Sequence, residues 1–388
     1  MPTTIRTSDP RELLALIPFQ LGFQPVESAV LVSVRADHGV GLIARVDLAD
    51  LRPDGGGQLA RALVSHMVND GARRAVVVLY TAEDLQDDAA DSGGAVAVAL
   101  LRDAAGHHLG EIDCWVVGPD GYYSIGCGDT ACCPPGGRSL DDLQGTRVGA
   151  QMVLEGVQVA RSRNDLVRIP ATLPAARKAA RRARVRWESR YPADSPSDAH
   201  RWRRDGLELW RGEVARAEAA ARLSSPPGGA DGIRPTVFGG HSPDAPAPTV
   251  IGRLQAALAD VLVRDAVLLT LVRGGDRVAD AVVAGDAGAD VGRALRTIID
   301  PAEGRRPDRG LTEPARVVLE QVVAHCSRPG HAPALTLLAV LAWWEGDGAR
   351  AGVLVDRALL AAPGYRLAVL VDDALRLGMP PGWARAQA

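Results

Sequence analysis

Two strongly apolar runs, residues 75–80 and 112–117, of which the second contains only Asp113 as a charged residue near its start, constrain the fold of this chain more than any other feature of its sequence. A run without polar alternation is typical of a β-strand that is buried on both faces. A helical pattern over residues 95–107 lies between the two runs. Because a strand-helix-strand connection implies parallel pairing, with helices covering the sheet, the sequence predicts an α/β domain.

The segments around these runs extend the prediction to a mixed sheet. Residues 28–34 and 39–48 are rich in Val, Leu and Ile and are joined by turn residues, which predicts a β-hairpin. Residues 59–68 have helical periodicity, and residues 122–125 follow a Pro-Asp-Gly turn as another strand. The predicted order is β, β, α, β, α, β, β, with antiparallel hairpins at the edges of the sheet.

A short helix is predicted before this sheet, over residues 10–17. The carboxylate of Asp9 is placed to accept from the free N–H groups of its first turn. Pro18 is expected to end the helix, because proline lacks the N–H that continues the hydrogen-bond ladder.

The rest of the chain predicts an all-α, repeat-like domain. Alanine-rich or periodic segments, expected to be helices, cover residues 140–160, 173–191, 196–223, 250–273, 286–299 and 313–326. Many Pro and Gly residues at 224–249 predict a mobile linker that cannot hold a core. The 388 residues are therefore expected to divide into an α/β domain at 1–160, a helical extension with a basic helix at 161–223, the linker at 224–249 and a helical domain at 250–388.

Composition and charge exclude several classes of function. A net charge of -3 gives no general attraction to nucleic acid or to anionic lipid. The start of the sequence lacks a signal pattern, and no run approaches the roughly 18 apolar residues that span a bilayer, so we expect a cytoplasmic protein that does not bind membranes. Lys178 is the single lysine, and its surroundings fit neither a phosphate-binding loop nor a Schiff-base site.

A turn-rich segment at residues 122–137 reads Tyr-Tyr-Ser-Ile-Gly-Cys-Gly-Asp-Thr-Ala-Cys-Cys-Pro-Pro-Gly-Gly. Together with Leu-Gly-Phe-Gln-Pro-Val-Glu-Ser at 21–28, it resembles the actinobacterial proteins grouped as DUF4192. That resemblance implies no assigned activity and no catalytic residue.

A second resemblance concerns residues 335–363. The run Trp-Trp-Glu-Gly-Asp-Gly-Ala-Arg-Ala at 343–351 and Pro363 are similar to the second half of a tetratricopeptide repeat. One such unit implies a single helical hairpin, through which we expect contacts with a partner protein.

The cysteines of the 122–137 segment suggest a metal site. Thiolates of Cys127, Cys132 and Cys133 suit zinc or an iron-sulfur cluster, with Cys114 on the preceding strand as a fourth ligand. Two separated Cys-x-x-Cys pairs are missing, and adjacent side chains do not easily reach one ion. The alternatives are a reactive thiol or a structural turn with buried thiols, and the second is favoured because Pro134 and Pro135 build a rigid exit.

Two groups of residues are candidates for binding a small ligand. One group surrounds the first hairpin, where it is suited to orienting a phosphate or carboxylate, and consists of Glu27, Ser28, Arg45 and Asp47. The other lies after a strand, where α/β proteins bind ligands, and consists of Tyr122, Tyr123 and Asp129. The alternatives are a surface ion pair between Arg45 and Asp47 and tyrosines that pack on the sheet.

A basic helix over residues 174–190 is a candidate for binding nucleic acid or another polyanion. Ala176, Ala180, Ala183 and Trp187 form one packing stripe, and the basic residues point elsewhere. Those proposed to contact phosphates are Arg177, Lys178, Arg181 and Arg184. The favoured alternative is a solvated face that pairs with acidic residues of the next helix, among them Asp205 and Glu208.

These patterns together predict a non-enzymatic binding or adaptor protein. Its α/β domain is expected to recognise a ligand, and its helical domain a protein. An enzyme or metal-dependent protein that uses residues 122–137 is the first alternative, and polyanion binding is the second. We expect no cofactor, with zinc as the alternative, and no catalytic residue.

Overall fold

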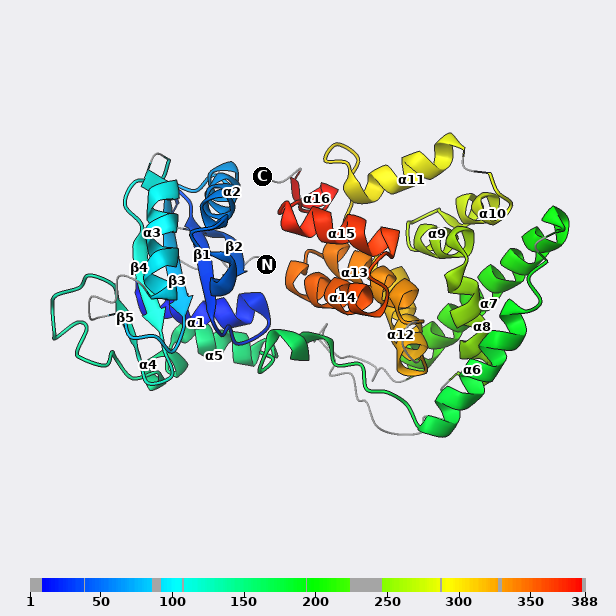
Figure 1. The fold of residues 1–388 in the computed structure, drawn as a ribbon, viewed down its shortest axis with the longest axis horizontal. Coiled ribbons are helices and arrows are strands. Elements are labelled where there is room, and N and C mark those ends of the chain that lie inside the picture. Colours follow the sequence, from blue (N-terminus) through cyan, green and yellow to red (C-terminus); the bar gives the residue numbers. More distant parts are fainter. Residues whose placement is uncertain are drawn as a thin grey trace. The chain divides into compact units, whose positions relative to one another are not determined.

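The computed structural model describes residues 9–37, 39–85, 92–106, 108–192, 194–223, 246–286, 288–326 and 330–385. The chain forms two compact units, Met1–Leu166 and Val167–Gln387, and each is described by itself. The first contains a mixed sheet with helices and the second is largely helical, as the sequence predicts (Figure 1). Most of the predicted linker lies outside the described residues. Its last part is described and includes the start of a helix at Pro248.

The first unit is built on a five-stranded sheet in the order β2-β1-β3-β4-β5. β1 is antiparallel to β2 and to β3, β3 is parallel to β4, and β4 is antiparallel to β5. The predicted hairpin and the predicted parallel pair are therefore confirmed. The strands are β1 (Ser28–Val34), β2 (Val40–Asp47), β3 (Arg74–Tyr80), β4 (Asp113–Val117) and β5 (Tyr122–Ser124).

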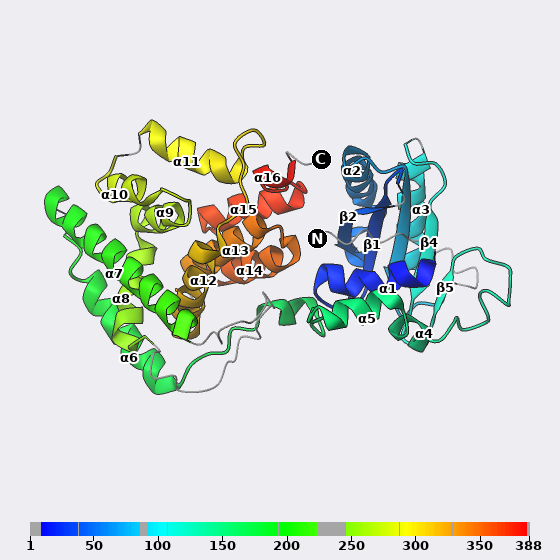
Figure 2. The ribbon, with the colours of Figure 1, turned by 180° about the vertical axis from the view of Figure 1, so that it is seen from behind.

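Both faces of the central strands are buried, which explains their strongly apolar runs. Successive side chains point to opposite faces, so Val77 packs in one core with α2 and α3, and Val78 packs in another with α1. Figure 1 shows α2 and α3 on the near face of the sheet, and Figure 2 shows α1 on the other face. The helices and short 3₁₀ turns of this unit are α1 (Pro10–Leu21), η1 (Leu48–Asp50), α2 (Gly56–Asn69), α3 (Gly93–Gly106), α4 (Asp141–Gln144) and α5 (Arg147–Leu154).

α1 is longer than predicted, because Pro18 does not end it. The helix continues to Leu21 and stops at Gly22, which has φ 76° in the left-handed region that glycine adopts without strain. The cap by Asp9 is confirmed, since its carboxylate accepts from the N–H of Arg11. Proline removes one rung of the ladder, and burial of α1 against the sheet outweighs that loss.

The single helix predicted over residues 140–160 is also wrong. The segment forms the short helices α4 and α5, separated by Gly145 and Thr146. Thr146 has an extended backbone, and its hydroxyl accepts from the N–H of Gly149, so it caps α5 as a new helix. Alanine content and periodicity did not reveal this break.

The second unit is an assembly of helices in which α6 and α8 pack very closely. A β-carbon at Gly252 of α8 would collide with the backbone carbonyl of Ala180 of α6, so glycine is required for this approach. The elements are η2 (Arg163–Val167), α6 (Pro174–Glu188), α7 (Pro196–Leu223), α8 (Pro248–Ala259), α9 (Val261–Thr270), α10 (Asp276–Val283), α11 (Ala289–Ile299), α12 (Arg309–Ala324), α13 (Ala332–Glu345), α14 (Gly348–Ala361), α15 (Arg366–Arg376) and α16 (Gly382–Arg385).

The helix predicted over residues 250–273 is two helices, because Asp260 interrupts it. Asp260 has an extended backbone, and its carboxylate accepts from the N–H groups of Leu262 and Val263 at the start of α9. Aspartate competes in this way with the helical ladder and favours a new start. The sequence analysis also missed α10, α15 and α16, which are short.

α13 lies at the centre of the helical core. Its side chains from Ala334 to Trp344 are all buried, so it lacks an exposed stripe. It turns at Gly346 into α14, and the two helices pack against each other. The indole N–H of Trp344 donates to the carbonyl of Arg305, which satisfies the polar end of this buried ring.

None of the helices within the described ranges has the length and apolarity that crossing a membrane requires.

Candidate functional site

A pocket of about 870 Å³ lies at one edge of the sheet, on the face covered by α1. The parallel strands β3 and β4 end there at Tyr80 and Val117, which are paired neighbours. β1 begins at the same edge, because its Ser28 pairs with Tyr80 in the antiparallel register. The pocket therefore occupies the position where open α/β sheets bind ligands, beyond the carboxyl ends of parallel strands.

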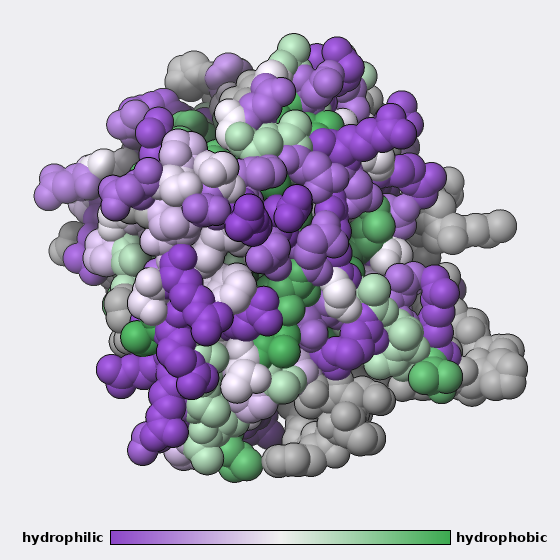
Figure 3. Space-filling model, turned by 90° about the vertical axis from the view of Figure 1, so that its right-hand side faces the viewer, coloured by the Kyte–Doolittle hydropathy of each residue, from purple (hydrophilic) through white to green (hydrophobic). Residues whose placement is uncertain are grey.

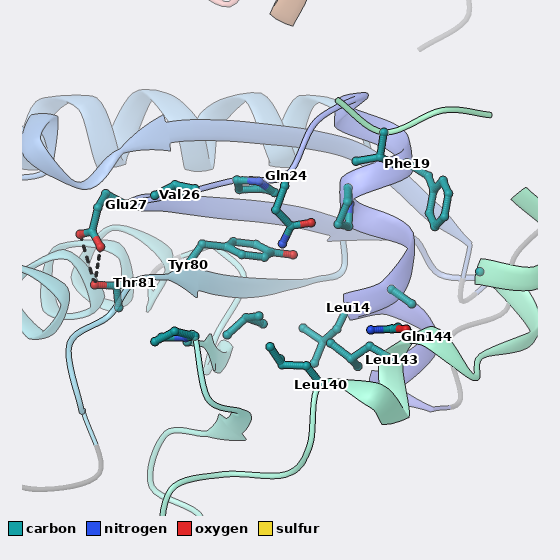
Figure 4. Close-up of a pocket in the computed structure, with 18 of the residues that line it drawn as sticks. Leu14, Phe19, Gln24, Val26, Glu27, Tyr80, Thr81, Leu140, Leu143 and Gln144 are labelled. Carbon is teal, nitrogen blue, oxygen red and sulfur yellow. Dashed lines mark hydrogen bonds between the residues drawn. The ribbon is translucent and has the colours of Figure 1, made fainter. Parts of the chain in front are cut away.

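The walls of the pocket come from α1, α4 and α5 and from the segments that enter or leave the strands. Most lining side chains are apolar: Leu14, Ala15, Pro18, Phe19, Pro25, Val26, Val117, Pro119, Leu140, Leu143, Ala150, Val153 and Val159. Polar groups come from Gln24, Gln144, Thr81 and Tyr80 (Figure 4). Among the described residues that line the pocket, Glu27 is the only one with a charged side chain. A pocket of this size and character suits a small organic molecule.

Glu27 is held in place by contacts with the end of β3. Its carboxylate accepts from the hydroxyl of Thr81, at 3.2 and 3.3 Å, and from the N–H of Ala82, at 3.2 Å (Figure 4). Its φ of 43° is the only positive φ outside glycine among the described residues. A left-handed conformation is costly for a side chain of this type, and such outliers gather at functional sites.

Tyr80 contributes a buried hydroxyl to this region. Its side chain is 3% exposed, and its hydroxyl has no hydrogen-bond partner among the described residues. Burial alone raises the pKa of Tyr80 far above its usual value, so the hydroxyl stays protonated at neutral pH. In Figure 4 its ring extends among the lining side chains and its hydroxyl points toward the amide of Gln24. Buried polar groups are nearly always paired, so an unpaired one beside a pocket suggests a missing partner.

Of the first predicted ligand group, only Glu27 lines the pocket. Arg45 lies on β2, where its guanidinium donates to the hydroxyl of Ser28 at 2.9 Å and forms an ion pair with Asp47. The hydroxyl of Ser28 in turn donates to the carbonyl of Val26. Arg45 is thus committed to neighbours on the strands. No basic residue is among the described residues that line the pocket, which does not favour a phosphate or carboxylate ligand.

The second predicted group is divided between different places. Tyr122 packs on the α1 face, with its hydroxyl 3.5 Å from Asp142, and Tyr123 packs on the opposite face of the sheet. The hydroxyl of Tyr123 accepts from the N–H of Leu85 at 2.7 Å and donates to Asp84. Asp129 shapes the cysteine loop, where its carboxylate accepts from the N–H of Ala131.

The cysteine loop brings three sulfur atoms together. The Sγ atoms of Cys127, Cys132 and Cys133 lie within 4.8 Å of one another. Cys114, expected as a fourth ligand, is not part of this group, and its buried thiol donates to the carbonyl of Ile112. Burial, with the neighbouring Cys127 and Cys132, raises the pKa of the Cys133 thiol in the metal-free chain.

The basic helix packs as its stripe predicts. Ala180, Ala183 and Trp187 of α6 are buried, and the guanidinium of Arg253 stacks 4.2 Å from the centre of the Trp187 ring. Arg184 forms an ion pair with Glu188 within α6. Three further members of the predicted set have no ion pair with any other described residue: Arg177, Lys178 and Arg181.

The sequence analysis missed most of the pocket. The sequence predicts Tyr80 as a strand residue and Pro18 as a helix-end residue, and Gln24 appears there only within the motif at 21–28. The one available signal was the position of Tyr80 and Thr81 at the carboxyl end of a predicted parallel strand. The walls from α4 and α5 carried no such signal, because they are distant in the sequence.

The fold and the pocket together define a two-part protein, in which an α/β unit with an apolar pocket precedes a helical unit. The chain belongs to the family described as a domain of unknown function, DUF4192, whose model matches residues 10–382. The match extends over both units, well beyond the 122–137 segment. Neither the curated proteins nor the solved structures contain a match to this chain.

Proposed function

We propose that this protein is a non-enzymatic, cytoplasmic binding protein whose first unit takes up a small, mostly apolar molecule that is neutral or cationic. The observation that carries the proposal is the buried hydroxyl of Tyr80, which has no partner among the described residues and lies beside an apolar pocket of about 870 Å³. A ligand with one polar group would supply the missing hydrogen bond, while its apolar body fills the pocket. Glu27, as the only charge among the described lining residues, disfavours an anion.

Binding of the neutral, solvent-sensitive dye Nile red by the full chain tests this proposal. We expect saturable brightening and a blue shift of its emission, and much weaker brightening of the anionic dye anilinonaphthalene sulfonate. Ala150→Trp should abolish the Nile red signal, because Ala150 is an exposed residue of α5 that lines the pocket. Tyr80→Phe should weaken the binding of Nile red about 2- to 10-fold, because it removes one neutral hydrogen bond to the carbonyl of the dye.

Leu154→Trp is the matched control for pocket filling. Leu154 lies on the same helix and is 87% exposed, but it does not line the pocket, so this variant should bind like the wild type. The proposal fails if Nile red does not bind saturably. It also fails if Ala150→Trp and Leu154→Trp reduce the signal equally, since the dye would then report another surface.

The helical unit is proposed to contact a partner protein through a tetratricopeptide-like hairpin formed by α13 and α14. Support comes from the left-handed turn at Gly346 and from the buried small residues Ala351 and Ala358, which allow close helix packing. Leu360 and Leu370 are 66% and 55% exposed on α14 and α15. A partner that co-purifies with the wild type should be lost when both are changed to Glu, and retention of that partner would contradict the proposal.

Polyanion binding by α6 is a second candidate, and one observation favours it. Several of the acidic residues of α7 that were expected to neutralise α6 pair instead with arginines of their own helix, as in Arg211–Glu208 and Arg216–Glu213. The basic face of α6 is therefore left without those partners. This end of the helical unit is largely hydrophilic (Figure 3).

Salt elution from heparin resin tests this second candidate. The triple variant Arg177→Gln, Arg181→Gln and Arg184→Gln should elute at clearly lower salt than the wild type, because fewer counterions are released. A control triple variant removes exposed arginines that already have acidic partners: Arg201, Arg222 and Arg293. If the two triple variants lower the elution salt equally, retention on heparin depends on net charge alone, and a site on α6 is refuted.

A further inference from the structure

We infer that Cys127, Cys132 and Cys133 form a three-thiolate site for a thiophilic divalent cation of the zinc class, with water as the fourth ligand. The inference is independent of the ligand pocket, because the thiols pack with the opposite core of the sheet, the one shared by α2 and α3. It rests on the position of the three sulfur atoms, which the fold brings together from two arms of one loop.

The loop begins where β5 ends and returns beside it. The N–H of Cys127 donates to the carbonyl of Ser124, which turns the chain away from the strand. The N–H groups of Cys132 and Cys133 both donate to the carbonyl of Asp129, which makes a tight turn. This turn directs the two adjacent cysteines back toward Cys127 and removes the objection that neighbouring side chains cannot reach one ion.

The spacing of the sulfur atoms is close to that of a bound ion. In a tetrahedral site with Zn–S bonds of about 2.3 Å, neighbouring sulfur atoms lie about 3.8 Å apart. The three Sγ atoms already lie within 4.8 Å of one another. Closing the site therefore requires shifts of about 1 Å or less, which side-chain rotation in a glycine-containing loop can supply.

One sulfur atom already accepts a backbone hydrogen bond. The N–H of Ser124 donates to Sγ of Cys133 at 3.4 Å. Such a donor fixes the position of the sulfur atom, as outer-shell donors do in metal sites. On metal binding each thiol would release its proton to solvent, and the dication would offset the charge of the thiolates.

The donor set selects the class of metal. Three thiolates and no carboxylate or imidazole suit a soft ion and disfavour magnesium or calcium. Cys127 and Cys132 are partly exposed, so water can reach the fourth position. The base of the loop is closed by pairing of Tyr122 with Arg138. The bound ion would fix the residues between these two ends, because that part of the loop has little apolar core of its own.

Metal analysis of the full chain, purified under reducing conditions without chelator, tests the inference. We expect zinc in a ratio near one per chain. Cobalt added to the chelator-stripped protein should give an intense thiolate-to-cobalt charge-transfer band in the near ultraviolet. Loss of one ligand, in Cys127→Ser, Cys132→Ser or Cys133→Ser, should weaken zinc binding by more than about 100-fold, beyond the effect of losing an outer-shell partner.

Cys326→Ser is the matched control, because Cys326 is a buried cysteine of the other unit and should not affect the metal. Cys114→Ser should also retain zinc, since Cys114 lies outside the sulfur group. The inference is overturned if the wild type neither holds zinc nor gives the cobalt band. Because that readout uses the wild type, it does not depend on folding of the variants. Retention of zinc by all three single variants would equally overturn it.

Discussion

Tyr80→Phe should stabilise the first unit, although it removes a polar group from a native core. The side chain of Tyr80 is 3% exposed, and within the part of the chain that the structure describes its hydroxyl has no hydrogen-bond partner. Such a hydroxyl gives up its hydrogen bonds to water on folding and regains none, which costs about 1–3 kcal/mol. Phenylalanine keeps the ring and avoids this cost, so the free energy of unfolding should rise by about that amount.

Hydrogen exchange of the full chain can measure this effect in the sheet itself. Peptides from β1 and β3, which pair along their length, should exchange more slowly by about 5- to 150-fold, the equivalent of 1–3 kcal/mol. Exchange reports this unit directly, whereas a single melting temperature would average two units.

Tyr123→Phe is the control, and it should lower the free energy of unfolding where Tyr80→Phe raises it. The hydroxyl of Tyr123 accepts from the N–H of Leu85 at 2.7 Å and donates to Asp84, so its loss leaves both groups without that contact. We expect faster exchange, equivalent to a loss of about 0.5–1.5 kcal/mol. If Tyr80→Phe also speeds exchange, the hydroxyl of Tyr80 has a partner, such as a bound water, and the reasoning is refuted.

Alkaline pH gives an independent check of the same hydroxyl. Burial raises the pKa of Tyr80 above its usual value of 10.0. The unfolded chain therefore loses this proton first, so the contribution of Tyr80 to stability is complete below about pH 10 and falls as the pH rises further. The wild type should lose stability above pH 10 more steeply than Tyr80→Phe, and identical slopes would contradict the assignment.

Two further predictions concern acid stability and helix packing. Burial opposes ionisation of Asp70, but its hydrogen bonds, the strongest of them from Arg35, outweigh burial and lower the pKa of Asp70 below 3.8. The contribution of Asp70 to stability is therefore present above about pH 4 and is lost as the pH falls. Asp70→Asn should therefore destabilise the chain in urea at pH 7 and much less at pH 3, and an equal loss at both would contradict this. Gly252→Ala should cost about 1–3 kcal/mol, because its β-carbon meets the backbone of Ala180. The control Gly212→Ala, in α7 with open space around it, should stabilise by about 0.5–1 kcal/mol, and a neutral Gly252→Ala would refute the close approach.

Strand identity was predictable because it depends on local composition. The runs that became β1, β3 and β4 are mostly apolar, and the charged residues of β3 and β4, Arg74 and Asp113, stand only at their first positions, as is typical of strands buried on both faces. Helix ends were less predictable, as Pro18 and Asp260 show. Whether a helix continues through a proline or stops at an aspartate depends on how much apolar surface the neighbouring turns bury.

Local sequence patterns were enough to predict the mixed sheet, the helical second unit and the cysteine-rich segment, since periodicity and turn chemistry act between near neighbours. Which side chains share a site depends instead on the tertiary fold. Tyr80 and Glu27 meet because β1 runs antiparallel to β3, and Leu143 of α4 joins them from more than fifty residues away. The same holds for the three sulfur atoms, because the turn at Asp129, not the spacing of the cysteines, brings them together.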